Sequence, residues 1–267
     1  MSSRVPAILR RLSATGRTRG LRPCTALALF ALLGTGSAHA GSSGSLSLTS
    51  DYIFRGISQS NQQPALQGGV ELSAANGAYA GAWGSSISWL SDLSTAAAPL
   101  SSSIELDAYA GYRGKLADAV AFDVGAQYYA YPGDFPSGFN RADTFELYAG
   151  VTVAASGKLS VGAKYALATT DLFGYAGSRG SGYLDLSATC AIAPGWALAA
   201  HAGRQWIEGN DAFAYSDWKL GVTRSFGNGA SVGLAWSGTD ADDALYTNPH
   251  GNRLARSTVA LTLGQAF

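Results

Sequence analysis

Beyond residue 40 the sequence alternates apolar and non-apolar residues, with a period of two over most of its length. This period places one kind of side chain on one face of a β-strand, whereas a membrane-spanning helix needs about 20 consecutive apolar residues. No apolar run of even about 18 residues follows residue 40. The pattern therefore predicts an all-β chain. A wall with one face toward lipid and the other toward water is typical of a transmembrane β-barrel.

Residues 1–40 have the parts of an export signal. Six arginines accompany a short apolar run at 25–33, and residues 37–40 (SAHA) end in the small-x-small pattern of a signal-peptidase site. We expect cleavage after Ala40, which leaves residues 41–267 as a single barrel domain. The pair Arg10-Arg11 and Cys24 suggest a twin-arginine signal and a lipoprotein. We disfavour both, because the arginine pair lies well before the apolar run and Cys24 precedes it.

Removal of this segment changes the charge of the protein. All 18 Asp and Glu lie beyond residue 40, while six of the 18 Lys and Arg lie before it, so the mature chain has 12 basic residues and a net charge of −6. This charge disfavours nucleic acid as a partner, because nucleic-acid binding requires a basic stripe. Cys190 is the only mature cysteine, which excludes an intramolecular disulfide. The many Gly, Tyr and Trp residues suit a barrel wall with aromatic residues at both lipid–water interfaces.

The alternation predicts about twelve antiparallel strands in up-and-down order. Their ranges are 46–55, 66–73, 79–89, 104–113, 120–129, 144–153, 159–167, 183–192, 196–205, 217–226, 232–236 and 259–267. Short connections such as Asn76-Gly77 and Ser156-Gly157 alternate with long polar ones such as 131–140 and 238–253. An even number of strands, with both termini at the short turns, is typical of the outer membrane of a Gram-negative bacterium.

Each strand also has a predicted facing. In the first strand, Leu46, Leu48, Tyr52 and Phe54 are expected to face lipid, and in the third strand the same is expected of Tyr79, Trp83, Ile87 and Trp89. The opposite faces carry mainly Gly, Ala, Ser, Thr and charged residues. A soluble β-sandwich is the alternative. We disfavour it because a core of small and charged side chains would pack poorly and leave carboxylates buried without partners.

The predicted inward face carries an excess of acidic residues. The lumen-facing charged residues expected to line a pore are Asp51, Arg55, Glu71, Glu105, Asp107, Arg113, Asp123, Glu146, Lys164, Asp185, Asp217 and Lys219. Eight acidic and four basic residues give this set a net charge of −4. A narrow pore with low-dielectric walls amplifies such a bias, so we expect a weak preference for cations. Asp51 and Arg55 share a face and are expected to form an ion pair.

The sequence offers little support for catalysis, and we predict that the protein is not an enzyme. Some twelve-stranded barrels are lipases with Ser, His and Asn on the outer wall, but His201 is on the predicted inward face and no serine nucleophile motif accompanies it. One cysteine and two distant histidines give no zinc-ligand spacing. The acidic loop around Asp240, Asp242 and Asp243 suits hard cations, but it lacks the glycine and distal glutamate of a calcium loop. No cofactor or metal is predicted.

Two stretches near the predicted first and second strands resemble a known family. Residues 48–60 (LTSDYIFRGISQS) and 64–69 (PALQGG) are similar to the opening signature of the proteobacterial conserved hypothetical Gcw_chp family, also named TorF-type porins. Residues 105–112 and 215–222 (YSDWKLGV) are similar to later blocks of that family. The resemblance covers residues 44–267. It implies an outer-membrane porin-like barrel without an assigned substrate, and it transfers no catalytic residues.

We therefore expect a channel for passive diffusion of small hydrophilic solutes. A closed structural or adhesive barrel remains a first alternative, because inward Tyr129, Tyr148 and Tyr183 could fill a lumen of this strand number. An outer-membrane lipid-modifying enzyme is a second alternative. The expected partners are membrane lipid, lipopolysaccharide, and the barrel-assembly machinery through C-terminal Phe267, although Gln265 stands where an apolar residue is usual in that signal. The oligomeric state stays open.

Overall fold

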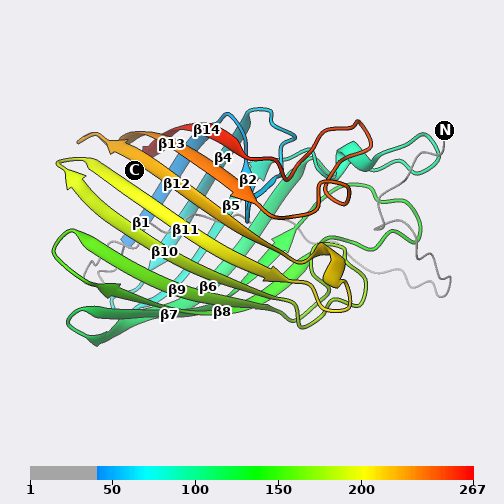
Figure 1. Cartoon of the computed structure of the whole chain (residues 1–267). Helices are drawn as coiled ribbons and strands as arrows, with labels where there is room; N and C mark the ends of the chain where they lie inside the picture. The colour runs from blue at the N-terminus through cyan, green and yellow to red at the C-terminus, as the bar shows by residue number, and fades with distance from the viewer. Residues whose placement is uncertain (1–40) are drawn as a thin grey trace.

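Twelve antiparallel strands close into a barrel in the computed structural model, which describes residues 41–267 (Figure 1). The strands are β1 (Gly41–Thr49), β4 (Ala65–Ser73), β5 (Ala78–Ser86), β6 (Ile104–Ala117), β7 (Val120–Ala130), β8 (Thr144–Ala154), β9 (Leu159–Ala168), β10 (Gly182–Ala193), β11 (Trp196–Trp206), β12 (Tyr215–Ser225), β13 (Ala230–Thr239) and β14 (Thr258–Ala266). Each strand pairs with its sequence neighbours in the wall, and β1 pairs with β14 to close it. The predicted fold class and the strand number are confirmed.

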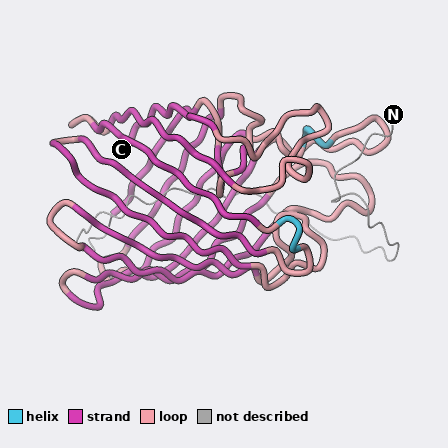
Figure 2. Tube along the Cα trace, viewed as in Figure 1, coloured by secondary structure: helices cyan, strands magenta, loops and turns pink. Residues whose placement is uncertain are grey.

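The two ends of the barrel differ in the length of their connections. Short turns and the C-terminus lie at one end, and the long loops gather at the other (Figures 1 and 2). The long loops also hold two short 3-10 turns, η2 (Ser91–Leu93) and η3 (Asp211–Phe213). In outer-membrane barrels the short turns are periplasmic and the long loops extracellular, and we name the two ends accordingly. Between residues 41 and 267 no helix combines the length and apolar content needed to cross a membrane.

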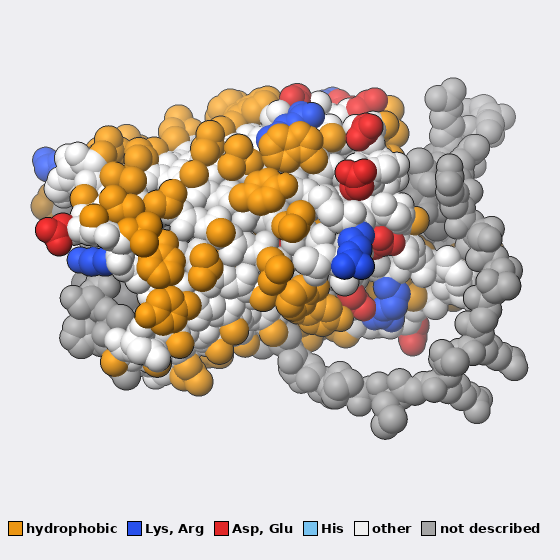
Figure 3. Space-filling model, turned by 90° about the horizontal axis from the view of Figure 1, so that it is seen from below, with side chains coloured by type: hydrophobic (Ala, Val, Ile, Leu, Met, Phe, Trp, Pro, Cys, Tyr) orange, Lys and Arg blue, Asp and Glu red, His pale blue; other side chains and the backbone are white. Residues whose placement is uncertain are grey.

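The outer surface carries an apolar belt, with charged side chains gathered near the two ends (Figure 3). Leucine and valine side chains such as Leu72, Leu220 and Val259 are more than half exposed on this surface. Aromatic side chains flank the belt, with Trp196 at the periplasmic side and Trp206 at the extracellular side. A surface of this kind is stable only against lipid, so the protein is an outer-membrane barrel.

The first strand ends earlier than predicted. β1 stops at Thr49, and the chain then forms a small hairpin from β2 (Ile53–Phe54) and β3 (Ile57–Ser58) before it enters β4. Arg55 and Gly56 form the two-residue turn with φ angles of 45° and 78°, the positive values that a type I′ turn requires. The prediction that Tyr52 and Phe54 face lipid is therefore wrong. The sequence is misleading here, because this hairpin has the same two-residue period as a wall strand.

The facing predicted for the third strand is also wrong. On β5 the side chains of Tyr79 and Trp83 are buried inside the barrel, as is that of Ile87 just after it, while Ala80 and Ser86 lie outside. The reason is the pairing with glycines: Tyr79 lies opposite Gly111, where a side chain would collide with the tyrosine ring. Hydrophobicity alone does not reveal that these amphipathic rings fill the lumen. The other strands have their predicted facing.

The predicted signal peptide, including its cleavage site after Ala40, lies outside the described residues. The division of the chain at that position therefore stays a prediction.

Candidate functional site

The hairpin β2–β3 projects into the extracellular half of the lumen. Its turn lies against the wall, since a Cβ at Gly56 would be 2.5 Å from Cβ of Asp217 on β12 and 3.1 Å from Cβ of Thr239 on β13. Around it the lumen is filled by side chains that are almost fully buried, including Tyr52, Tyr129 and Gln205. The hairpin therefore narrows this half of the barrel.

Arg55 holds the tip of the hairpin to distant strands of the wall. Its guanidinium donates to both carboxylate oxygens of Glu146 on β8, at 2.9 and 2.6 Å, and to Oε1 of Gln205 on β11 at 2.9 Å. It also stacks over the ring of Tyr183, 4.3 Å from the ring centre. The Arg55 side chain is only 8% exposed. A bidentate, charge-assisted pair in such surroundings fixes geometry strongly.

The predicted pair between Asp51 and Arg55 is wrong. Asp51 instead accepts hydrogen bonds from the hydroxyls of Ser58 at 2.6 Å and Ser60 at 3.2 Å, which brace the base of the hairpin. Its second oxygen, Oδ2, has no partner among the described residues. Burial raises the pKa of Asp51, while these serine hydrogen bonds oppose the rise. The turn at Arg55 carries the guanidinium away from Asp51 and across the lumen.

Two further carboxylates lie behind the hairpin on β6. Glu105 accepts a hydrogen bond from the hydroxyl of Tyr52 at 3.0 Å, and Asp107 accepts one from the amide of Gln127 at 2.9 Å. Both carboxylates are almost completely buried. Tyr52 also packs edge-on against Trp83, with ring centroids 5.4 Å apart. Polar and aromatic contacts together therefore hold the hairpin against this side of the wall.

Nearer the periplasm the charged residues form wall contacts without the hairpin. Arg113 pairs with Glu71 at 2.9 Å and lies over the ring of Tyr79. Asp123 accepts a hydrogen bond from the hydroxyl of Tyr79. The ammonium of Lys164 lies 3.8 Å from the centre of the Tyr148 ring, and its side chain is exposed to the lumen.

The periplasmic part of the lumen is less densely filled by side chains than the part at the hairpin. Its inward residues are small, such as Ser45, Thr152, Ser187 and Thr189, and they keep substantial exposure although they face inward. Exposed inward side chains require an open, wetted space. The barrel thus consists of a filled extracellular half and an open periplasmic half.

His201 lies between two carboxylates. Its Nδ1 is 3.2 Å from Asp185 and its Nε2 is 2.8 Å from Asp217, which also accepts a hydrogen bond from Tyr183. Ser187 pairs in register with His201 on the neighbouring strand. Both ring nitrogens already face carboxylates, so neither is placed to accept a proton from that serine. This arrangement disfavours the enzyme alternative.

The charged residues predicted to line the lumen all lie inside the barrel. Ten stand on wall strands, whereas Asp51 and Arg55 belong to the inserted segment. The wall residues are Glu71 on β4, Glu105, Asp107 and Arg113 on β6, Asp123 on β7, Glu146 on β8, Lys164 on β9, Asp185 on β10, and Asp217 and Lys219 on β12. Their role in lining a conducting pore stays a prediction.

The acidic loop after β13 is used for local structure. Asp240 accepts a hydrogen bond from the backbone of Ser216, and Asp243 pairs with Arg253 at 2.7 Å. Among residues 41–267, no group of three or more His, Cys, Asp or Glu side chains is arranged to hold a metal ion.

Several residues of the constriction escaped the sequence analysis. The alternation places Tyr52 and Phe54 on the lipid face and assigns no role to Gln205. The available signal was Arg55-Gly56, a pair that suits a tight turn in the middle of an apparent strand.

The fold and its lumen define the class of this protein as a porin-like outer-membrane barrel. Similar solved structures include a KdgM porin, with a TM-score of 0.55, 8% identity and coverage of 84% of this chain and 98% of that chain. Another is a KdgM porin in complex with disordered oligogalacturonate, with a TM-score of 0.53, 8% identity and coverage of 85% and 98%. A NanC porin has a TM-score of 0.53, 14% identity and coverage of 83% and 98%. These likenesses establish the fold.

The chain belongs to the Gcw_chp family, described as bacterial protein of unknown function, whose model matches residues 34–267. The predicted family is thereby confirmed, while the TorF-type name stays a prediction. No curated protein matches the chain in sequence.

Proposed function

We propose that the protein is a narrow channel for passive diffusion of small hydrophilic solutes, with a weak preference for cations. The observation that carries this proposal is the lumen itself. Its periplasmic half is open and lined by small polar residues, and the twelve charged residues predicted to line it have a formal net charge of −4. Fixed negative charge in a narrow, low-dielectric passage concentrates cations and repels anions.

The same charge argues against acidic oligosaccharides as substrates. One of the similar KdgM porins is described in complex with oligogalacturonate, which is a polyanion. Passage of a polyanion requires a ladder of basic groups, whereas the basic groups here are mostly engaged with rings or acids. Arg55 is paired with Glu146, and Arg113 with Glu71. Small neutral or cationic solutes therefore fit this lumen better.

Purified protein in a planar bilayer provides the test. Under a KCl gradient, the reversal potential should have the sign of a cation-preferring pore. A reversal potential of the opposite sign would contradict the proposed selectivity.

A closed structural barrel is the second candidate, and the packed hairpin favours it. Arg55, Tyr52 and their partners are buried and hydrogen-bonded across the lumen at the level of the hairpin. Liposome swelling separates the two candidates. Uptake of small sugars or amino acids supports the channel, and absence of both swelling and conductance supports the structural barrel.

A further inference from the structure

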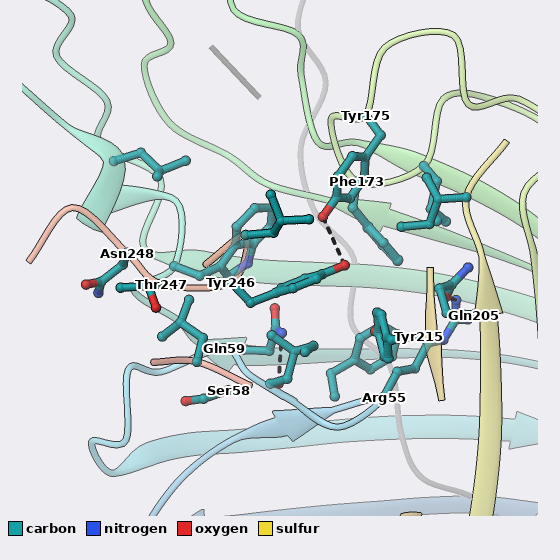
Figure 4. A pocket seen from close by; sticks show the side chains of 18 of the residues that line it. Arg55, Ser58, Gln59, Phe173, Tyr175, Gln205, Tyr215, Tyr246, Thr247 and Asn248 are labelled. Carbon is teal, nitrogen blue, oxygen red and sulfur yellow. Dashed lines mark hydrogen bonds between the residues drawn. The ribbon is translucent and has the colours of Figure 1, made fainter. Parts of the chain in front are cut away.

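A cavity lies between the hairpin β2–β3 and the extracellular loops (Figure 4). It has a volume of about 900 Å³, including the solvent at its mouth. The ends of β11 and β12 and the long loops complete its walls. Seven aromatic side chains are among the lining residues: Phe54, Trp89, Tyr131, Phe173, Tyr175, Tyr215 and Tyr246.

The hydroxyl groups of Tyr175, Tyr246, Thr247 and Ser58, which line this cavity, already have partners within the protein. Tyr175 donates to the hydroxyl of Tyr246 at 3.3 Å (Figure 4). Tyr246 donates in turn to the backbone carbonyl of Phe213 at 2.8 Å. Thr247 donates to a backbone carbonyl at 2.5 Å, and Ser58 donates to Asp51. Trp89 Nε1 has no hydrogen-bond partner among the described residues, but a sugar or an amino acid carries several polar groups and would lose more hydrogen bonds to water than it gains here.

The charged and amide groups of the lining are engaged as well. Arg55 directs its donors at Glu146 and Gln205. The amide of Gln205 donates in turn to the carbonyls of Gly182 and Trp206, both at 3.0 Å. An anionic ligand would have to displace Glu146 from Arg55 and leave that carboxylate buried without its partner. The cavity therefore favours a neutral ligand.

The rings are held in fixed relative positions. Tyr246 packs edge-on against Tyr215 and Phe213, with ring centroids 5.5 and 6.0 Å apart, and Tyr175 packs against Phe213 at 4.9 Å. A wall that is already ordered costs little entropy when a ligand binds. These rings can also pack edge-to-face against an aromatic ligand in the cavity, which is a preferred geometry of aromatic pairs.

We propose that this cavity is a binding site for a small neutral aromatic molecule that enters from the extracellular side. The site takes a ligand of a different chemical class from the hydrophilic solutes of the proposed channel. The cavity lies on the extracellular side of the contact between Arg55 and Glu146, so binding there does not require conduction through the barrel.

The test is a titration of 4-fluorotoluene into the full barrel in lipid nanodiscs, followed by ¹⁹F NMR with empty nanodiscs as the blank. We expect saturable binding in addition to the linear partition into lipid. Leu245 lines the cavity, so Leu245→Trp fills it and should weaken binding at least about tenfold. Leu261→Trp places the same side chain on the lipid face of β14 and should leave binding unchanged. If Leu245→Trp does not assemble, Leu254→Phe fills the cavity from another segment.

Competition defines the ligand class. Glucose should not displace the probe, and benzoate should displace it far less than toluene does. The proposal is overturned if uptake is linear and equal in empty nanodiscs, if the filling variants bind as the unmodified protein does, or if glucose competes as well as toluene. Conductance is measured on the same preparation, so that a failure of the binding proposal can be distinguished from a failure of the channel proposal.

Discussion

The guanidinium of Arg55 and the carboxylate of Glu146 meet across the lumen in a two-point contact, at 2.6 and 2.9 Å, although 91 residues separate them in sequence. Arg55 belongs to a hairpin that leaves the wall after β1, and Glu146 belongs to β8 on a distant part of the wall. This contact fastens the inserted segment to the barrel.

Arg55→Ala should free the hairpin and enlarge the pore. The change removes the contact with Glu146 and leaves that carboxylate buried with only the hydroxyl of Tyr129, which is 3.2 Å away. We expect a several-fold larger conductance in planar bilayers and a free energy of unfolding lower by about 3 kcal/mol. Arg141→Ala is the control, because its pair with Asp143 is half exposed and contributes about 0–1 kcal/mol. Unchanged conductance in Arg55→Ala would mean that the hairpin does not limit the pore.

Gly56→Ala should loosen the docking of the hairpin through packing. The added methyl group would lie 2.5 Å from Cβ of Asp217, at a residue whose φ of 78° already disfavours side chains. Gly177→Ala is a matched control, since Gly177 has a φ of 71° but open space around the position of the new atom. Conductance should rise in Gly56→Ala alone, while both variants keep the heat-modifiable mobility of a folded barrel on gels. Equal effects in the two variants would assign the change to backbone strain.

Asp51→Asn should alter how stability depends on pH. Burial raises the pKa of Asp51 in the folded protein above its unfolded value, so its favourable contribution is complete below the unfolded pKa and is lost as the pH rises through the folded pKa. Asparagine keeps the oxygen that accepts from Ser58 and Ser60 and carries no charge. The melting temperature of Asp51→Asn relative to the unmodified protein should therefore increase from pH 4 to pH 7. A constant difference over this range would contradict the burial argument.

Lys164→Gln should strengthen cation preference. Lys164 is one of the four basic residues predicted to line the lumen, and its side chain is exposed beside Tyr148. Its removal leaves the interior more negative by one charge, so the reversal potential under a KCl gradient should move further toward the cation limit. Arg224→Gln tests the role of position, because Arg224 lies on the outer face beside Trp196 and should not affect selectivity. A shift of equal size in both variants would locate the selectivity outside the lumen.

Deletion of Phe267 should reduce assembly in the outer membrane. The backbone of Phe267 exchanges two hydrogen bonds with Gly44, at 2.8 and 3.0 Å, and so extends the pairing of β1 with β14. Phe267→Ala keeps these backbone bonds and removes only the terminal ring. If the ring is the signal read by the assembly machinery, both variants should accumulate less folded barrel in membrane fractions. If only the deletion has an effect, the role of Phe267 is to close the wall.

The wall was predictable from sequence because lipid on one side and water on the other impose a strict alternation on every strand. The facing of residues such as Leu220 and Lys219 could therefore be predicted directly from the alternation. The interior was less predictable, because tyrosine and tryptophan suit both the lipid interface and a packed lumen. For Tyr79 the deciding partners are Gly111 and Asp123, which lie far away in sequence. The hairpin escaped prediction for a related reason, since its strands alternate as wall strands do and only the turn at Arg55 and Gly56 differs.

The inserted hairpin is joined to the wall by short stems, at 50–52 before β2 and 59–64 after β3. Both stems attach at the same seam, since β1 and β4 are neighbours in the barrel. The hairpin is therefore covalently joined to the wall at both of its ends, unlike a separate plug domain that could leave the pore. In the proposed channel, any displacement of the hairpin is limited by the length of these two stems, and with it the size of the molecule that could pass.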